Sequence, residues 1–168
     1  MQCRRGWTLI ELVMVLVLLV IVGVVSFAAI DSYRTQYLRA AAERIANDLS
    51  YAKNLAQTSS TWHGVSFSIT PLNSYSLYTT DGAIDTAIKS PQDPDQDYGV
   101  DIESDYSGVL ISNVNIGAGS KVEFDPYGVP YTDKTGSALT ADGVITLSIA
   151  GSTMTVMISA GTGRIYVQ

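Results

Sequence analysis

The sequence predicts an α+β fold in which a long N-terminal helix, transmembrane in its first half, precedes a small antiparallel β-sheet or sandwich domain. Three observations lead to this prediction. Residues 6–30 are apolar with few exceptions. Residues 31–59 contain neither glycine nor proline and repeat apolar residues every three or four positions, which is the period of a helix. After residue 64, apolar and polar residues alternate in short runs, which is the period of a strand.

The apolar stretch is long enough to cross a membrane. Residues 12–30 form a run of 19 residues without a charge. At about 1.5 Å per residue, a helix of that length nearly spans a hydrocarbon layer of about 30 Å. Arg4 and Arg5 precede the run and Asp31 follows it, and an excess of positive charge marks the cytoplasmic side. We therefore predict a transmembrane segment over residues 7–30, a cytoplasmic N-terminus and an exported remainder.

One carboxylate, Glu11, interrupts the apolar stretch. A charge costs about 2.5–3.5 kcal/mol at the centre of a bilayer and less near its surface, so an acid in this position is a candidate functional residue. Glu11 is expected to need a partner of opposite charge. The alternative is an interfacial carboxylate that extends to the lipid headgroups.

Three interpretations of the first 30 residues compete. The first is a secretory signal peptide, with basic residues, an apolar core over residues 12–25 and a small-x-small site at Ser26-Phe27-Ala28. Glu11 fits poorly at the start of such a core, and the sequence after Ala28 continues as a helix. The second is a plain membrane anchor, and the third depends on a family resemblance.

Residues 5–13, RGWTLIELV, resemble the signature of type IV pilins and type II secretion pseudopilins. The resemblance implies that residues 1–6 are a leader peptide, which a prepilin peptidase removes between Gly6 and Trp7 on the cytoplasmic side. It also implies N-methylation of the new Trp7 amine. Trp7 stands where phenylalanine is more usual. The apolar helix would then remain in the mature protein as an assembly device.

The resemblance also supplies a partner for Glu11. In this family the carboxylate neutralises the N-terminal amine of the neighbouring subunit, here the amine of Trp7. An unpaired charge is expensive at low dielectric, and a facing opposite charge offsets part of that cost in one register only. Glu11 would therefore set the register during assembly.

Residues 31–60 are expected to continue the helix into the exported domain. One narrow apolar stripe runs along it, while Arg34, Arg39, Arg44 and Lys53, with Glu43 and Asp48 between them, are expected on a charged, solvent-facing side. The stripe faces a partner surface and consists of Leu38, Ala42, Ile45, Leu49, Ala52 and Ala56.

Residues 61–168 are expected to form a β-rich periplasmic domain. Val65, Phe67 and Ile69 alternate with serines, and a second alternating run over residues 75–79 follows a turn, so the two predict a hairpin. Gly151-Ser152 suits a tight reversal with a positive φ. Later strands are expected at residues 109–116, 121–124, 144–149, 154–158 and 165–167.

Residues 81–108 are read as a long, acidic surface loop. Eight acids face one base, Lys89, and Pro91 and Pro94 interrupt any regular element. Residues 93–99 alternate carboxylates as calcium loops do, but Tyr98 and Ser104 stand where an EF-hand needs glycine and glutamate. A calcium site of another kind over residues 93–105 and a solvated acidic loop remain the two alternatives; no metal ligand and no cofactor is assigned.

Composition argues against several other functions. The formal net charge is −6, and it becomes −8 once Arg4 and Arg5 leave with the leader, so a nucleic-acid partner is not expected. The single cysteine, Cys3, lies in the leader. His63 is the only histidine and no nucleophile motif accompanies it, so we expect no enzyme activity and read His63 as a capping or surface residue.

Three further segments resemble H-type (GspH/FimT family) minor pseudopilins and FimT/FimU-like minor pilins. They imply an H-type minor pseudopilin in the pseudopilus of type II secretion, in the inner membrane, with other pseudopilins, prepilin peptidase and the assembly platform as partners. The alternatives are a minor pilin of a type IV pilus and, more distantly, a membrane-anchored binding protein that never polymerises. Some FimT-like members bind DNA with a Gly-Arg-x-Arg ending, but Tyr166 replaces the second arginine here, and Thr162-Gly163-Arg164 reads as a turn before the last strand. The three segments are residues 41–56, 124–128 and 161–165.

Overall fold

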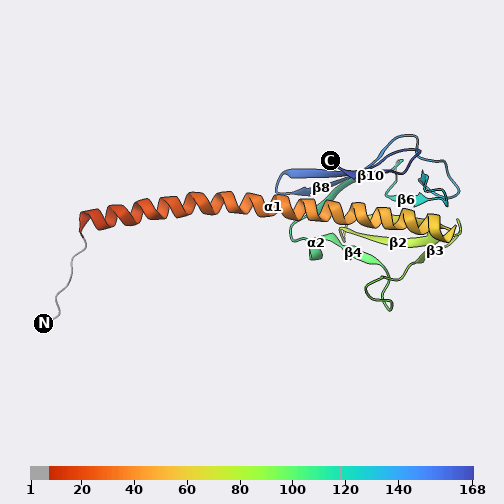
Figure 1. Cartoon of the computed structure of the whole chain (residues 1–168), viewed down its shortest axis with the longest axis horizontal. Helices are drawn as coiled ribbons and strands as arrows, with labels where there is room; N and C mark the ends of the chain where they lie inside the picture. Colours follow the sequence, from red (N-terminus) through yellow and green to blue (C-terminus); the bar gives the residue numbers. More distant parts are fainter. Residues whose placement is uncertain (1–7, 118) are drawn as a thin grey trace. The chain divides into compact units, whose positions relative to one another are not determined.

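The structure is a computed structural model that describes residues 8–117 and 119–168, with the side chains of residues 24–32 left out. The leader over residues 1–6, the Gly6–Trp7 cleavage site and the methylation at Trp7 therefore lie outside the described residues. The chain divides into two compact units, Met1–Thr35 and Gln36–Gln168. We call the second unit the head (Figure 1).

Helix α1 covers Leu9–Ser59, so it ends one residue before the predicted boundary at residue 60. Thr8 precedes its first turn: the Thr8 carbonyl accepts from the backbone N–H groups of Glu11 and Leu12 at 3.1 and 3.2 Å, and Thr8 Oγ1 accepts from the Glu11 N–H at 3.4 Å as a cap. It stops where Ser60 takes a positive φ of 55°. The described residues contain no helix that is both long and apolar enough to cross a membrane, so the structure does not confirm the transmembrane segment predicted over residues 7–30.

Two antiparallel sheets make up the rest of the head. The first has the order β3-β2-β1-β6-β7, with β4 also paired to β2, and the second has the order β10-β9-β8-β5. The first sheet comprises β1 (Trp62–Ser68), β2 (Ser74–Thr80), β3 (Asp85–Ala87), β4 (Gly99–Asp101), β6 (Lys121–Phe124) and β7 (Pro130–Tyr131). The second comprises β5 (Leu110–Asn115), β8 (Gly143–Ile149), β9 (Ser152–Ile158) and β10 (Ile165–Val167).

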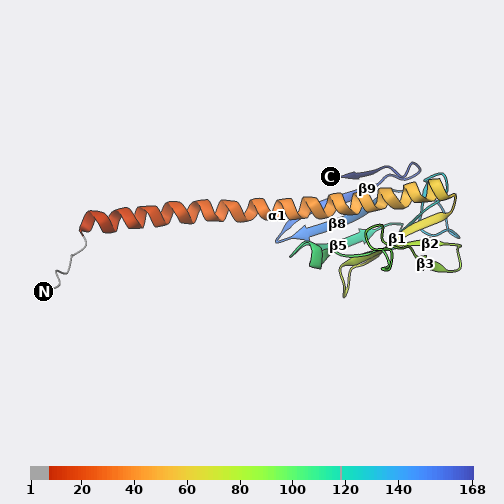
Figure 2. The ribbon, with the colours of Figure 1, turned by 60° about the horizontal axis from the view of Figure 1, so that its bottom comes forward.

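The core of the head lies where the two sheets meet the head part of α1, and Figure 2 shows strands of both sheets running beside this helix. All six residues of the predicted stripe on α1 are buried. The predicted hairpin is present as β1 and β2, with Val65 opposite Leu77 and Phe67 opposite Tyr75. In the second sheet, Ile145 lies opposite buried Val156. The periodic parts of the sequence therefore predicted the core correctly.

Residues 81–108 are mostly exposed, as expected of a surface loop, but the prediction that they contain no regular element was wrong. The segment adds β3 and β4 to the edge of β2 and forms a short helix, α2 (Ile102–Asp105), which Asp101 caps by accepting from the Ser104 N–H at 3.1 Å. Tyr98, Val100 and Ile102 are buried. These apolar residues alternate with acids that point to solvent, and the density of charge concealed their strand-like spacing.

The turn between β8 and β9 lies one residue earlier than expected. Ile149 pairs with Ser152, so the two turn residues are Ala150 and Gly151, with φ angles of 46° and 90°. Two positive φ angles are typical of a type I′ turn, in which glycine and asparagine are favoured.

Candidate assembly site and the polar junctions of the head

Glu11 lies in the first turn of α1, where the helix dipole favours a negative charge. Its side chain is exposed, and it is the only charged residue between Leu9 and Gly23. The carboxylate is therefore available to a positive group from another molecule. Trp7, the proposed source of that group, lies outside the described residues, so the structure does not place the two side chains together.

The residues around Glu11 form a large exposed apolar surface. Every large hydrophobic side chain from Leu9 to Val22 is exposed, between 41% for Val15 and 84% for Leu9. Contiguous apolar surface of this kind marks a site that contacts lipid or another protein. We call the exposed hydrophobic side chains of Leu9–Val22 the apolar surface. This surface, together with Glu11 within it, is the candidate assembly site.

Asp48 is buried in the head, which corrects its predicted position on the solvent-facing side of the helix. It is 6% exposed, and its carboxylate accepts from Tyr75 Oη at 2.6 Å, Tyr98 Oη at 2.8 Å and Arg44 Nε at 3.0 Å. These three donors satisfy a charge that burial would otherwise make costly. In contrast, the exposed pair Arg39–Glu43, joined at 2.8 Å, lies on the solvent side as expected.

The Asp48 cluster changes the acidity of its tyrosines. Burial, together with the hydrogen bond to Asp48 and its charge, raises the pKa of Tyr98 to about 12. The same causes raise the pKa of the more deeply buried Tyr75 further. Burial alone would lower the pKa of Arg44, but the carboxylate of Asp48 raises it well above its usual range. The cluster joins α1 to β2 and to the segment before β4.

A second junction brings together the three segments that carry the family resemblance. Lys53 Nζ donates to the carbonyl oxygens of Thr162 at 2.9 Å and Gly163 at 3.0 Å. Gln57 Nε2 donates to the carbonyl of Tyr127 at 3.1 Å. A Cβ on Gly128 would lie 2.6 Å from Gln57 Nε2 and 2.7 Å from Lys53 Cε, so a side chain there would displace the ends of these two side chains. Segments far apart in the sequence therefore meet on one face of α1.

The turn predicted at Thr162-Gly163-Arg164 is present. Gly163 has a φ of 60°, and its N–H donates to the Ser159 carbonyl at 2.9 Å. The guanidinium of Arg164 lies over the Tyr166 ring, 5.9 Å from its centroid. Arg164 is exposed and leads into β10.

Glu123 is a buried acid that the sequence analysis did not identify. It is 1% exposed, and it accepts from Tyr78 Oη at 2.9 Å, Lys121 Nζ at 3.1 Å and the Lys134 N–H at 2.6 Å. Gly64 lies opposite Glu123, and a Cβ there would lie 2.6 Å from Tyr78 Cζ. The only signal in the sequence is an acid inside the apolar run of β6.

His63 was predicted to be a capping or surface residue, and of these two alternatives the surface position is wrong. It is buried within β1, and its Nε2 lies 3.1 Å from Ser59 Oγ and 3.0 Å from Thr61 Oγ1, so it holds the end of α1. Burial lowers the pKa of His63 below its usual range. Among the described residues, no group of three or more histidine, cysteine, aspartate or glutamate side chains is placed to hold a metal ion.

Comparison with known proteins identifies the fold. The sequence matches no family model and no curated protein sequence. The structure is similar to the minor pseudopilin EpsH from the type 2 secretion system of Vibrio cholerae, with a TM-score of 0.58 and 10% identity over 78% of this chain and 95% of that chain. It is also similar to the type IV minor pilin FimU of Pseudomonas aeruginosa PAO1, with a TM-score of 0.56 and 15% identity over 80% of this chain and 90% of that chain.

A second crystal form of FimU gives a TM-score of 0.53 at 15% identity, over 78% of this chain and 92% of that chain. At these identities the similarity shows the fold. The chain has the GspH/FimT-like pilin fold that the three segments implied.

Proposed function

We propose that this chain is an H-type minor pseudopilin of a type II secretion system, built into the pseudopilus that drives protein export. The observation that carries the proposal is the combination of two features in one chain. The apolar surface over Leu9–Val22 contains a single carboxylate. The head has the fold of EpsH and FimU. The apolar surface needs a partner that covers it. The fold of the head is shared with a minor pseudopilin and a minor pilin.

In the proposed mechanism, prepilin peptidase cuts between Gly6 and Trp7, and the new Trp7 amine is methylated. Until assembly, the apolar helix over residues 7–30 lies in the inner membrane, with the N-terminus cytoplasmic and the head periplasmic. The assembly platform then transfers it into the filament, where it packs beside the helices of other pseudopilins. Glu11 pairs with the amine of the neighbouring subunit. This ion pair favours one register of the two helices, because an unpaired charge is costly at low dielectric.

The second candidate is a FimT/FimU-like minor pilin of a type IV pilus. The similarity to FimU favours it about as much as the similarity to EpsH favours the first, since the TM-scores are 0.56 and 0.58. The two functions share the N-terminal helix and differ in the subunits beside it. A membrane-anchored binding protein that does not polymerise is the third candidate.

Crosslinking in membranes tests these candidates. A photoreactive residue at Ile10, beside Glu11, is expected to capture secretion pseudopilins; capture of pilus subunits would favour the second candidate. Glu11→Ala is expected to abolish capture, whereas Glu43→Ala, which removes an exposed acid of the head part of the same helix, is the control and should not. Capture that persists in Glu11→Ala would favour the third candidate.

Processing is tested separately by the mass of the N-terminal peptide of the native protein. A peptide that begins with methylated Trp7 is the expected result. A mature chain that begins near Ala29 would mean ordinary secretion and would refute the proposal, because the apolar surface would be missing.

A further inference from the structure

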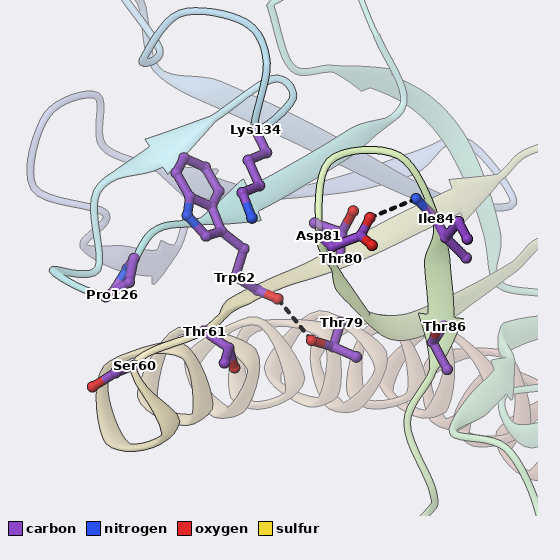
Figure 3. Close-up of a pocket in the computed structure, with 10 residues that line it drawn as sticks. All are labelled: Ser60, Thr61, Trp62, Thr79, Thr80, Asp81, Ile84, Thr86, Pro126 and Lys134. Carbon is purple, nitrogen blue, oxygen red and sulfur yellow. Dashed lines mark hydrogen bonds between the residues drawn. The ribbon is translucent and has the colours of Figure 1, made fainter.

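The head has an open cavity of about 580 Å³ where α1 ends. Figure 3 shows its lining, in which Trp62, Lys134 and Asp81 come from β1, from the loop after β7 and from the turn between β2 and β3. Pockets of 300–1,000 Å³ are the usual size for small ligands. The filament role proposed above makes no use of this cavity. The other lining residues are Ser60, Thr61, Thr79, Thr80, Ile84, Thr86 and Pro126.

The indole of Trp62 is a partly exposed, fixed platform in this cavity. Tyr131 packs against it edge-on, with ring centroids 4.9 Å apart and an interplanar angle of 66°. Lys134 Nζ lies 5.8 Å from the centroid of the same indole. A fixed aromatic ring offers a large apolar contact to a flat ligand without losing conformational freedom on binding.

A donor and an acceptor stand beside the platform. Asp81 is held in place because its Oδ1 accepts from the N–H groups of Ala83 and Ile84 at 2.8 and 2.7 Å. The stem of Lys134 packs on the same turn, since a Cβ on Gly82 would lie 3.3 Å from Lys134 Cδ. An ammonium only donates hydrogen bonds and a carboxylate only accepts them, so the pair suits a ligand with hydroxyl groups that do both.

The charges and the floor of the cavity narrow the choice of ligand. A negatively charged ligand would be repelled by Asp81, and a positively charged ligand would be repelled by Lys134. An apolar ligand would leave both charged groups without hydrogen-bond partners. The floor consists of inner strands, since β1 pairs with β2 and β6, and β2 pairs with β1 and β3. One lining residue, Thr86, belongs to β3, which is an edge strand, so the test below includes a peptide as a competitor. A neutral molecule with one apolar face and a rim of hydroxyl groups meets every feature.

We propose that this cavity is a carbohydrate site that binds a neutral pyranose. The C–H face of the sugar ring stacks on Trp62, and neighbouring hydroxyl groups bridge Lys134 and Asp81. The threonine hydroxyls around the cavity supply further polar contacts. This would allow the head to bind a glycan on a partner or on an exported protein, whichever filament contains it.

Saturation-transfer NMR on the full chain in detergent micelles tests the proposal, with methyl β-D-galactopyranoside and methyl β-D-glucopyranoside as probes. At least one sugar should receive saturation, most strongly at the ring C–H protons that face the indole. Lys134→Ala and Asp81→Asn should weaken binding about tenfold, as loss of a hydrogen bond to a charged group does. Trp62→Ala should abolish it and Trp62→Phe should retain part of it.

The matched controls are Arg164→Ala and Tyr166→Ala, which break the other cation–aromatic pair of the head. Both should bind the sugar as the parent chain does. Because Trp62→Ala removes a packed side chain, Lys134→Ala and Asp81→Asn decide the matter, with circular dichroism to verify that each variant is folded. The proposal is overturned if neither sugar receives saturation, if the folded variants bind like the parent, or if a neutral tripeptide amide displaces the sugar.

Discussion

The ammonium group of Lys53, on α1, donates to the backbone carbonyl of Gly163 at 3.0 Å, across 110 residues of sequence. It donates to the carbonyl of Thr162 as well, at 2.9 Å. One side chain thus fastens the turn before β10 to the helix. A hydrogen bond from a charged group contributes about 1.5–3 kcal/mol. Here the bond to Gly163 is partly buried and the bond to Thr162 is exposed, so we expect the first to supply most of the stabilisation.

We therefore expect Lys53→Met to destabilise the head by about 1.5–3 kcal/mol, since two carbonyl groups lose their donor while the aliphatic stem is kept. Urea unfolding should show a lower midpoint with an unchanged slope. Lys89→Met is the matched control, because the Lys89–Asp97 pair is exposed and such pairs contribute less than about 1 kcal/mol. Equal losses in the two variants would contradict a special role for Lys53.

Gly163 itself should not tolerate a side chain. Its φ is 60°, and an added Cβ would collide with the backbone carbonyl of Gly128. Gly161 also has a positive φ, 75°, but an added Cβ there meets nothing within 4 Å.

Gly161→Ala should therefore cost only the backbone term, about 1–2 kcal/mol. Gly163→Ala should cost clearly more, because the collision adds to the same term. Thermal unfolding of the two variants separates the contributions. If both lowered the melting temperature equally, the close approach of the two loops would be absent from the protein in solution.

The Asp48 cluster should make the head sensitive to alkali. The folded-state pKa of Tyr98 is about 12, above that of a free tyrosine, so the folded protein holds this proton more tightly than the unfolded chain does. The stabilisation is complete below about pH 10 and declines as the pH rises towards about 12. Burial and Asp48 raise the pKa of Tyr75 as well, which acts in the same direction.

Tyrosinate absorbance, recorded with circular dichroism, measures this effect. The tyrosines of the Asp48 cluster, whose pKa values are raised, should ionise together with unfolding. In Tyr98→Phe the alkaline decline should be smaller, whereas Tyr127→Phe, which alters a tyrosine that is 85% exposed, should leave it unchanged. An identical alkaline transition in all three proteins would show that the cluster does not control it.

Asp48 and Glu123, two of the buried acids, show what sequence periodicity can and cannot predict. The apolar stripe on α1 and the alternating strands repeat at short range, so their burial follows from neighbouring residues. Asp48 instead depends on Tyr75 and Tyr98, which lie 27 and 50 residues away, and Glu123 depends on Tyr78, 45 residues away. From periodicity alone, an acid in a helix or strand is predicted to be exposed to solvent. Its burial can be predicted only when the distant hydrogen-bond donors are known.

The same reasoning explains the acidic segment and the candidate assembly site. Between residues 81 and 108 the acids outnumber the apolar residues that anchor the segment. The prediction therefore gave more weight to the high charge of the segment than to the strand-like spacing of its apolar residues. Glu11 is the opposite case, because an isolated acid in an apolar run stands out in the sequence. In the structure its side chain is exposed, and no ion pair joins it to another described residue. The role that we propose for Glu11 depends on a second subunit.

The turn between β8 and β9 offers a stabilising change. Ala150 holds a φ of 46° on the surface, where an alanine is strained and an asparagine is much better accommodated. Ala150→Asn creates the Asn-Gly pair that type I′ turns favour, and relief of this strain should raise stability by about 0.5–1 kcal/mol.

Thermal unfolding of the full chain measures the gain as a melting temperature several degrees higher, as a change of about 1 kcal/mol produces in a domain of this size. Ala141→Asn is the matched control, since Ala141 is also exposed in a loop but is not among the residues with a positive φ. Only the variant at position 150 should gain stability. A gain in both would indicate a general effect of asparagine on solubility, and a loss at position 150 would mean that the turn is not of type I′.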